Sequence, residues 1–367
     1  MAETLFEESR RYILGKMRGI LREGGRKLPT DRELAGEMFA SYATIRLVMG
    51  ELEREGFIRR IRGSGTYLEP GAAELLERAF LPVVRLFTSP VNGTADNDYA
   101  AWLVAELTRQ AAGKRFRIEH RQVATHNAFL AELDKEADSR VPVVYLPPTA
   151  PFTMQQLGRL GRFDHIPLVV IDCELGNINV NNITTDNRKG GMLAARTLLA
   201  GGCRKLALLL CEPPLRQISQ RVQGFTEIAE LSGAEVEIWD CQVRGDDERT
   251  ALAHRKTLAA LRAGHRPDGI FAVSDSGAVS AAEAIRQSGF ELGRDIALIG
   301  FDGLPATRTH KPSLGSIAQP VAEIGEEVFS LLGTWQQGTH VQKLLSPRFQ
   351  SGASVMKKEK ATTAIPT

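Results

Sequence analysis

The chain has 367 residues, of which 43% are hydrophobic and 25% charged, and its formal net charge is +2. These values are ordinary for a globular protein, and the length predicts two or three structural units. The four cysteines form no CxxC pair, which argues against a zinc site or a disulfide framework, and no apolar run approaches the roughly 18 residues of a membrane span. The N-terminus lacks the apolar core of a signal peptide, so we expect a cytoplasmic protein with no membrane contact.

The chain begins with an amphipathic pattern that predicts a helix from about Thr4 to Glu23, closed by two glycines. Thr30 is a candidate N-cap for a second helix that ends near Phe39, because Asp31 and Glu33 favour the positive end of a helix. Ser41 is the candidate N-cap of a third helix.

The third predicted helix carries one apolar stripe and is followed by a basic hairpin. The stripe repeats at positions i, i+3, i+4 and i+7, and it consists of Ile45, Val48, Met49 and Leu52. Gly56 ends the helix, and two short β-type runs, 57–62 and 66–68, are joined by three residues that include two glycines. Two helices, a short turn and a basic hairpin are the layout of a winged helix-turn-helix.

Several polar residues of this segment are predicted to point away from the buried stripe. If the third helix enters a major groove, residues near its start and on the hairpin meet base edges and phosphates of double-stranded DNA. The candidate DNA-binding residues are Arg32, Ser41, Tyr42, Thr44, Arg46, Arg62 and Gly63. The alternative is a small helical domain whose basic hairpin is merely solvated.

The first 70 or so residues resemble the DNA-binding domain of the gluconate-repressor (GntR) family. The shared pattern is L-P-S-E-R-E-L, then S-R-x-T-V-R, then L-x-x-x-G-x-I and a glycine-rich wing. The positions that match it are Leu28, Pro29, Arg32, Glu33, Leu34, Ser41, Thr44, Arg46, Leu52, Gly56, Ile58, Arg62, Gly63, Gly65 and Thr66. Tyr42 departs from the pattern, which has arginine there, so a guanidinium that could read guanine is missing.

Beyond the Glu69-Pro70-Gly71 break, the pattern changes to short apolar strands that alternate with amphipathic helices. Predicted strands cover 83–88, 116–123, 143–146, 168–172, 206–211, 236–239, 270–273 and 296–301. Predicted helices cover 99–112, 128–136, 191–200, 221–231, 251–263 and 277–288. This alternation predicts an α/β fold with parallel, doubly wound sheets, and its length predicts two lobes.

We therefore predict four segments. Residues 1–69 form the winged helix-turn-helix, 70–80 a linker that contains a short helix, 81–355 a two-lobed domain, and 356–367 a disordered polar tail. Ligand sites in such sheets lie outside the carboxyl ends of the strands. Ser274 and Asp302 follow predicted strands, Asp186 follows the segment Ile183-Thr184-Thr185, and Arg221 opens the helix after the strand 206–211. Each of them could instead serve as a helix cap.

Residues 81 to about 355 resemble the effector domain of the lac repressor family, which shares its fold with periplasmic sugar-binding proteins. The resemblance lies in the segments Thr185–Gly191, Arg221–Phe225, Ala272–Asp275 and Ile299–Asp302, the last leading to Pro312-Ser313-Leu314. It implies that Asp186, Arg221, Ser274 and Asp302 surround a ligand, although asparagine is common where Ser274 stands. Carboxylates and a guanidinium suit the hydroxyl groups of a sugar, and Tyr99 is a candidate stacking residue.

A GntR-type DNA module joined to a lac-repressor-type sensor resembles the arabinose-repressor subgroup of transcription regulators. This resemblance implies a homodimeric repressor that a monosaccharide releases from operator DNA, without a cofactor or a metal ion. A ligand-dependent activator and a co-repressed regulator are the alternatives within this class. An enzyme is the remote alternative, since the chain has no GxSxG, HExxH or Walker motif and no metal-ligand spacing among its histidines. A transport component would need a secretion signal.

Overall fold

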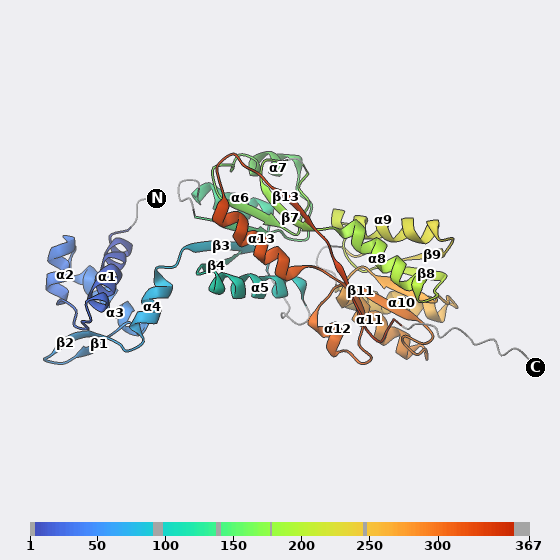
Figure 1. The fold of residues 1–367 in the computed structure, drawn as a ribbon, viewed down its shortest axis with the longest axis horizontal. Coiled ribbons are helices and arrows are strands. Elements are labelled where there is room, and N and C mark those ends of the chain that lie inside the picture. Colours follow the sequence, from blue (N-terminus) through green and yellow to red (C-terminus); the bar gives the residue numbers. More distant parts are fainter. Residues whose placement is uncertain (1–3, 91–97, 137–140, 177, 245–247, 356–367) are drawn as a thin grey trace, which may run out of the picture. The chain divides into compact units, whose positions relative to one another are not determined.

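The computed structural model describes residues 4–90, 98–136, 141–176, 178–244 and 248–355, and Figure 1 shows the order of its elements. The chain divides into two compact units, the first made mainly of Met1–Pro82 and the second of most of the chain from Val83 onward. Among the described helices, none has the length and apolar character needed to span a bilayer. The predicted disordered tail, 356–367, lies outside the described residues.

The first unit contains the three helices and the hairpin of a winged helix-turn-helix, as predicted. Thr4, Thr30 and Ser41 each accept a hydrogen bond from the backbone amide three residues on. These caps satisfy amides that the first turn of a helix leaves unpaired, which explains why the helices begin there. The elements are α1 (Leu5–Arg22), α2 (Asp31–Met38), α3 (Tyr42–Arg54), β1 (Ile58–Ile61), β2 (Gly65–Leu68) and α4 (Ala72–Ala79).

One hydrophobic core holds the first unit together. The predicted stripe of α3 is fully buried, and it packs in one cluster with Ile13 and Met17 of α1 and Leu34 of α2. Ala72 and Leu76 of α4 are buried in the same core. The helix expected in the linker therefore packs with the winged helix-turn-helix.

The second unit has two lobes, each built on a six-stranded sheet. The first sheet has the order β13-β7-β6-β5-β3-β4, and the second has the order β14-β12-β11-β10-β8-β9. The pairings described within these sheets are parallel, except that the edge strand β14 runs antiparallel to β12. The predicted parallel, doubly wound α/β fold is thus confirmed.

The sequence patterns located most of these elements, but they missed four short strands (β7, β12, β13 and β14) and three helices (α7, α12 and α13). The first lobe comprises β3 (Val83–Thr88), α5 (Tyr99–Gly113), β4 (Arg117–Gln122), α6 (His126–Glu136), β5 (Val143–Leu146), α7 (Met154–Leu160), β6 (Leu168–Ile171), β7 (Asn181–Thr185), α13 (Val321–Thr334) and β13 (Gln342–Leu345). The second comprises α8 (Asn187–Ala200), β8 (Lys205–Leu210), α9 (Arg216–Leu231), β9 (Glu235–Asp240), α10 (Arg249–Arg262), β10 (Gly269–Ala272), α11 (Asp275–Gln287), β11 (Ala297–Asp302), α12 (Pro305–Thr309), β12 (Gly315–Ala318) and β14 (Arg348–Gln350).

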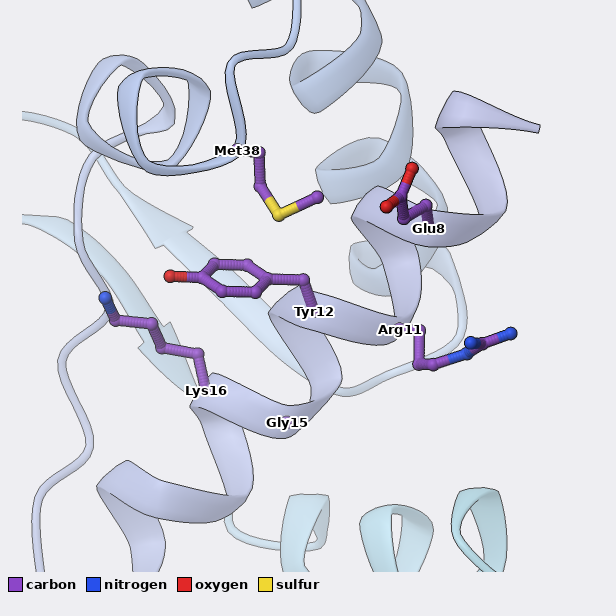
Figure 2. A pocket seen from close by; sticks show the side chains of 6 residues that line it. All are labelled: Glu8, Arg11, Tyr12, Gly15, Lys16 and Met38. Carbon is purple, nitrogen blue, oxygen red and sulfur yellow. The ribbon is translucent and has the colours of Figure 1, made fainter. Parts of the chain in front are cut away.

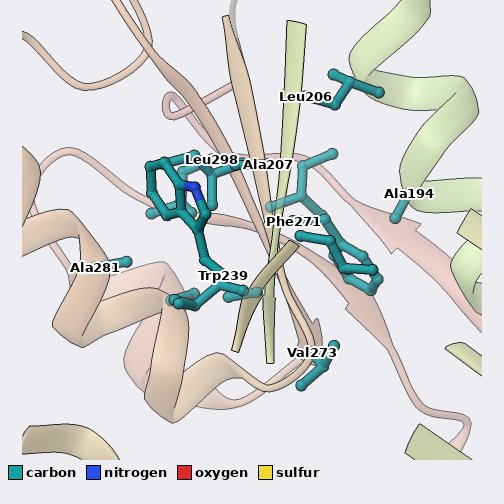
Figure 3. Close-up of a cluster of buried hydrophobic side chains, with 14 of the residues drawn as sticks. Ala194, Leu206, Ala207, Trp239, Phe271, Val273, Ala281 and Leu298 are labelled. Atoms are coloured by element: carbon teal, nitrogen blue, oxygen red, sulfur yellow. The ribbon is translucent and has the colours of Figure 1, made fainter. Parts of the chain in front are cut away.

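Helices cover both faces of the second sheet. Helices α8 and α9 pack against each other over one face, and α10 and α11 pack against each other over the other. Figure 3 shows the resulting core, in which Phe271 and Leu298 of the central strands lie among side chains of the covering helices. Burial on both faces explains why the strands read as continuous apolar runs.

The chain passes between the lobes three times. It leaves the first lobe after β7, returns after β12 through Gln319 and Pro320, and leaves again after β13 to form β14. We refer to these three crossovers together as the hinge, and two of them carry residues of the site described below.

Two glycines set the distance between α8 and α9. A Cβ atom on Gly191 would lie 2.0 Å from the carbonyl oxygen of Arg221, and one on Gly224 would lie 1.9 Å from that of Arg188. Both clashes are with backbone, so a side chain at either position would force the helices apart. The glycines therefore fix the position of α9, and with it the position of Arg221.

We expect Gly191→Ala to destabilise the second unit by about 1–3 kcal/mol, the usual cost of overpacking. Differential scanning calorimetry of the full chain measures this change. Gly333→Ala is the matched control, because a Cβ atom at this helical position in α13 meets no atom within 4 Å. Equal stability of the two variants would show that the helices separate without cost.

Candidate functional site

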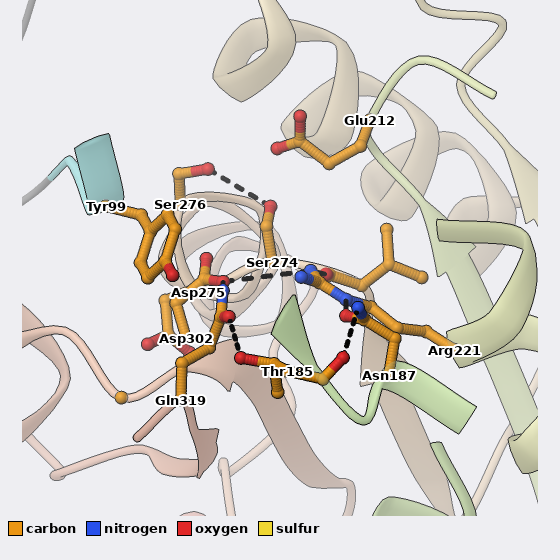
Figure 4. A network of polar contacts seen from close by, with 12 residues as sticks. Tyr99, Thr185, Asn187, Glu212, Arg221, Ser274, Asp275, Ser276, Asp302 and Gln319 are labelled. Carbon is orange, nitrogen blue, oxygen red and sulfur yellow. Dashed lines mark hydrogen bonds and ion pairs between the residues drawn. The ribbon is translucent and has the colours of Figure 1, made fainter. Parts of the chain in front are cut away.

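A cluster of polar side chains lies beside the crossovers of the second unit (Figure 4). Strand ends, a helix start and two crossovers bring these residues together, although they are far apart in the sequence. The cluster consists of Tyr99, Thr185, Asn187, Glu212, Arg221, Ser274, Asp275, Ser276, Asp302 and Gln319.

Arg221 is the centre of the cluster and is only 4% exposed. Its Nε donates to Oδ1 of Asn187 at 2.8 Å, and its Nη1 donates to the carbonyl oxygen of Val273 at 2.7 Å. The guanidinium also lies 3.6 Å from the centroid of the Phe301 ring. Helix α9 begins at Arg216, so the expectation that Arg221 opens this helix was wrong. Its place in the second turn lets the guanidinium reach across the strand ends.

Asp302 faces Arg221 from the end of β11, with Oδ1 3.7 Å from Nη1 of the guanidinium. The same oxygen accepts a hydrogen bond from Nε2 of Gln319 at 2.9 Å. Gln319 in turn accepts one from the hydroxyl of Thr185 at 2.7 Å, which links two crossovers to each other. Burial raises the pKa of Asp302 although Arg221 opposes this shift. The carboxylate is thus tied directly to the hinge.

Ser274 and Asp275 differ in the hydrogen bonds that their side chains already make within the protein. Asp275 accepts from the hydroxyl of Ser316 at 2.6 Å and from the backbone amide of Leu304 at 2.7 Å, which makes it a structural carboxylate. Ser274 caps α11 through a long bond from the amide of Gly277, and its hydroxyl lies 3.2 Å from that of Ser276. The Ser274 hydroxyl also lies 3.4 Å from the thiol of Cys211, so its contacts are all longer than the two hydrogen bonds of Asp275.

The structure brings together only part of the predicted ligand set. Arg221, Ser274 and Asp302 lie in the cluster, and Tyr99 joins them from the first turn of α5. The carboxylate of Asp186 instead caps α8, where it accepts from the amide of Lys189 at 2.9 Å.

Asp172 is a residue of this site that the sequence reasoning missed. It follows β6 in the first lobe, and its Oδ1 lies 3.5 Å from the hydroxyl of Tyr99. Its backbone has φ 55°, a left-handed conformation that asparagine and aspartate tolerate but that is strained for most residues. Burial raises its pKa to about 6. Its place at the end of the predicted strand 168–172 was the one available signal.

Two contacts join the lobes next to this cluster. Glu174 of the first lobe accepts from Nε of Arg216 at 2.9 Å and from Nε2 of Gln220 at 2.5 Å, both on α9. Arg249 pairs with Glu212 at 2.6 Å and also donates to the hydroxyl of Thr149 in the first lobe at 3.3 Å. The lobes are therefore held together by side chains on both sides of the site.

The first unit presents unpaired cations on the predicted DNA face. The side chains of Arg32, Arg46 and Arg62 are exposed, and the ion pairs found among the described residues include none of them. Arg60, by contrast, pairs with Asp31 at 3.2 Å. Free guanidinium groups on a helix face and a hairpin can meet phosphates or base edges.

The other predicted DNA-face residues have mixed positions. Tyr42 is 49% exposed on the first turn of α3, and Gly63 at the hairpin tip has φ 77°. Ser41 serves as the cap of α3, and its hydroxyl lies 2.8 Å from that of Thr44. These two hydroxyl groups therefore have partners within the helix start.

An open hollow of about 500 Å³ lies on the first unit, between α1 and the end of α2. Figure 2 shows its lining, with the Tyr12 ring and Met38 between charged side chains. Tyr12 and Lys16 both donate to Glu37, so the polar groups along its edge are paired. The hollow is distinct from the polar cluster of the second unit.

We expect Asp172→Asn to raise stability at neutral pH. The folded-state pKa of about 6 lies above the ordinary 3.8, so the ionised carboxylate costs folding free energy, roughly 3 kcal/mol at most. This cost is full above pH 6 and disappears as the pH falls toward about 4. Urea unfolding of the variant and of the control Asp164→Asn, whose side chain is half exposed, between these pH values measures the difference. A gain that is independent of pH would contradict the assignment.

Comparisons with known proteins match the two units separately. Residues 17–68 match the family described as bacterial regulatory proteins, gntR family, and residues 195–355 match the periplasmic binding protein-like domain. The ribose operon repressor of Haemophilus influenzae is 30% identical over 164 residues, which are 44% of this chain and 48% of that protein. This chain therefore spans about half of that relative. The arabinose metabolism transcriptional repressor of Geobacillus stearothermophilus is 26% identical over 327 residues, or 83% of this chain and 84% of that protein.

Solved structures establish the fold of the second unit. A LacI family transcriptional regulator from Enterococcus faecium with bound ribose has a TM-score of 0.62 at 20% identity, over 75% of this chain and 100% of that one. The dimeric Lac repressor has a TM-score of 0.64 at 19% identity, over 76% of this chain and 100% of that one. The chain thus joins a winged helix-turn-helix that matches the gntR family of bacterial regulatory proteins to a two-lobed domain that matches the periplasmic binding protein-like domain.

Proposed function

We propose that this protein is a transcription regulator of the cytoplasm, a repressor that a small sugar-like effector releases from its operator. The first unit binds double-stranded DNA, and the polar cluster of the second unit binds the effector. Both relatives named above are repressors, of a ribose operon and of arabinose metabolism, which supports this reading over an enzyme. The sugar-type effector rests on the same relatives and on the chemistry of the cluster.

The polar cluster supports effector control because two of its members lie in the crossovers. Thr185 and Gln319 connect Asp302 to the hinge, and Asn187 at the start of α8 holds Arg221. A ligand that bonds to Asp302 and Arg221 therefore acts on groups that are hydrogen-bonded to residues in the segments that join the lobes. This is the observation on which the proposal of ligand control depends.

The proposed sign of control is release. A ligand shifts the balance between an open and a closed arrangement only by its difference in affinity for the two. Groups from both lobes face the cluster, so a ligand that contacts both favours closure. We propose that the protein acts as a homodimer on a palindromic operator, in which closure changes the spacing of the two DNA-binding units and lowers operator affinity.

Arg46→Ala is expected to cost about 1–3 kcal/mol of operator affinity, because the exposed guanidinium on α3 reads a base or holds a central phosphate. Arg62→Ala is expected to weaken specific and non-specific DNA alike and to reduce the salt slope by about one. Fluorescence anisotropy with an operator selected from random duplexes measures both. Arg286→Ala, which removes an exposed arginine from the second unit, is the control for net charge. Parental affinity of Arg46→Ala would exclude α3 as the recognition helix.

Asp302→Ala is expected to bind operator as the parent does but to stay bound at effector concentrations that release the parent. The variant loses a charge-assisted hydrogen bond to the ligand while the DNA-binding unit is untouched. Anisotropy with and without a sugar found by thermal-shift screening measures this. Thermal melts check the fold, and Asp302→Asn, which keeps the side-chain size, repeats the test if Asp302→Ala unfolds. Normal release of the variant from the operator would show that Asp302 does not contact the effector. Tighter binding of the parent to the operator in the presence of effector would show co-repression instead of release.

A further inference from the structure

The polar cluster and its immediate surroundings contain more carboxylates than cations. The carboxylates are Asp172, Asp275, Asp302 and Glu212, and the cations are Arg221 and Arg249. Both cations already have partners among these carboxylates. Arg249 pairs with Glu212 at 2.6 Å, and Arg221 lies 3.7 Å from Asp302.

Of the two carboxylates that remain, only Asp275 is fully satisfied. Its two oxygens accept from the Ser316 hydroxyl and from the Leu304 amide. Asp172 has one weak partner, the Tyr99 hydroxyl at 3.5 Å, and the ion pairs found among the described residues do not include it. Among the carboxylates of the site, Asp172 is therefore the one without an ion pair among the described residues, and it can accept further hydrogen bonds from a ligand.

Among the residues that the structure describes, Arg221 of α9 is the cation that acts on the Asp172–Tyr99 pair, and Asp302 of β11 acts on Tyr99. Arg216 acts on the adjacent Cys173, but it is already paired with Glu174. Arg221 attracts Asp172, but its charge is shared with Asp302 and its Nε and Nη1 donate within the protein. A ligand group that approaches Asp172 must therefore bring hydrogen-bond donors, positive charge, or both.

Asp172 and Asp302 also resemble each other in position, since each stands at the end of a buried strand, one in each lobe. Asp302 has φ 127°, a backbone conformation that is strained for any residue but glycine, whereas the φ of 55° at Asp172 is one that aspartate tolerates. Strained residues such as Asp302 are found at binding and catalytic sites, where the surrounding structure holds them in place. Tyr99 interacts with both carboxylates. The two lobes thus present a pair of acceptor groups to the same space.

We propose that the site takes a hydroxyl-rich ligand without an acid group, either neutral or carrying a protonated amine, and that Asp172 sets this selectivity. This inference rests on the proposed function, because it refines the class of effector that acts at the same site. Hydroxyl and ammonium groups donate to Asp172, whereas a carboxylate or phosphate on the ligand adds a like charge, and both cations described in the cluster, Arg221 and Arg249, already face carboxylates of the protein. Sugar acids and sugar phosphates are therefore expected to bind this site more weakly than the corresponding neutral sugars.

The test is isothermal titration calorimetry of the full chain with matched sugars. The neutral members are D-ribose, L-arabinose and D-glucose, the acid members are D-ribose 5-phosphate, L-arabinonate and D-glucuronate, and D-glucosamine carries the amine. We expect the acid member of each pair to bind about 10- to 100-fold more weakly than the neutral one, from one like charge several ångströms away. Asp172→Asn is expected to reduce this gap at least about tenfold, whereas the half-exposed control Asp164→Asn, which is not among the cluster residues, leaves it unchanged.

Each other outcome has a defined meaning. An acid member that binds more tightly than its neutral partner overturns the inference but leaves a sugar-type effector in place. An unchanged gap in Asp172→Asn, with its fold verified by melting, overturns the role of Asp172. If no member of the panel binds, the sugar-type effector of the proposed function fails together with this inference, while operator binding by the Arg46 and Arg62 variants remains a separate test.

Discussion

The buried guanidinium of Arg221 is the interaction on which the second unit depends. A charged group that is 4% exposed must be paired and hydrogen-bonded, because an unpaired buried charge costs several kcal/mol. The protein meets this demand with Asn187 at the start of α8, the Val273 carbonyl at the end of β10 and the Asp302 carboxylate at the end of β11. One side chain thus binds three strand and helix ends together. For this reason, removal of the Asp302 carboxylate alters the proposed ligand site and also changes the free energy of unfolding.

Local sequence signals placed most of the helices and strands, because caps and apolar periodicity act over a few residues. Thr30 and Ser41 start helices as their neighbours indicated, and the stripe of α3 is buried as its spacing required. The strands that were missed are short, and β13 and β14 lie at the edges of their sheets, where the apolar pattern is weak. Strand β13 pairs with β7, 160 residues earlier (Gln342 with Asn182), and β14 pairs with β12, 34 residues earlier (Gln350 with Ser316), so no pattern within either strand reveals its partner.

The site was predicted in part for the same reason. The family resemblance supplied Arg221, Ser274 and Asp302, which the structure brings together, whereas Asp186 forms a helix cap. Gln319 and Thr185 had no signal of their own, because their role arises only where two crossovers run side by side. Asp172 ended a predicted strand, but its significance appears only when the partners of the other charges are known. Charge balance is a property of the assembled site.

Helix α9 contributes to the contact between the lobes, to the polar cluster and to the packing against α8. Arg216 and Gln220 in its first turns contact Glu174 in the other lobe, Arg221 follows in the cluster, and Gly224 packs on α8. A bidentate surface ion pair is worth only about 0.2–1 kcal/mol, so the Glu174 contact biases the lobes weakly. Control by a ligand requires that the protein's own preference for one arrangement of the lobes be small. A large preference would exceed the difference in ligand binding free energy between the open and closed arrangements, and the ligand could not then shift the balance. Changes along α9 should therefore be non-additive, since each shifts the same helix relative to the same hinge.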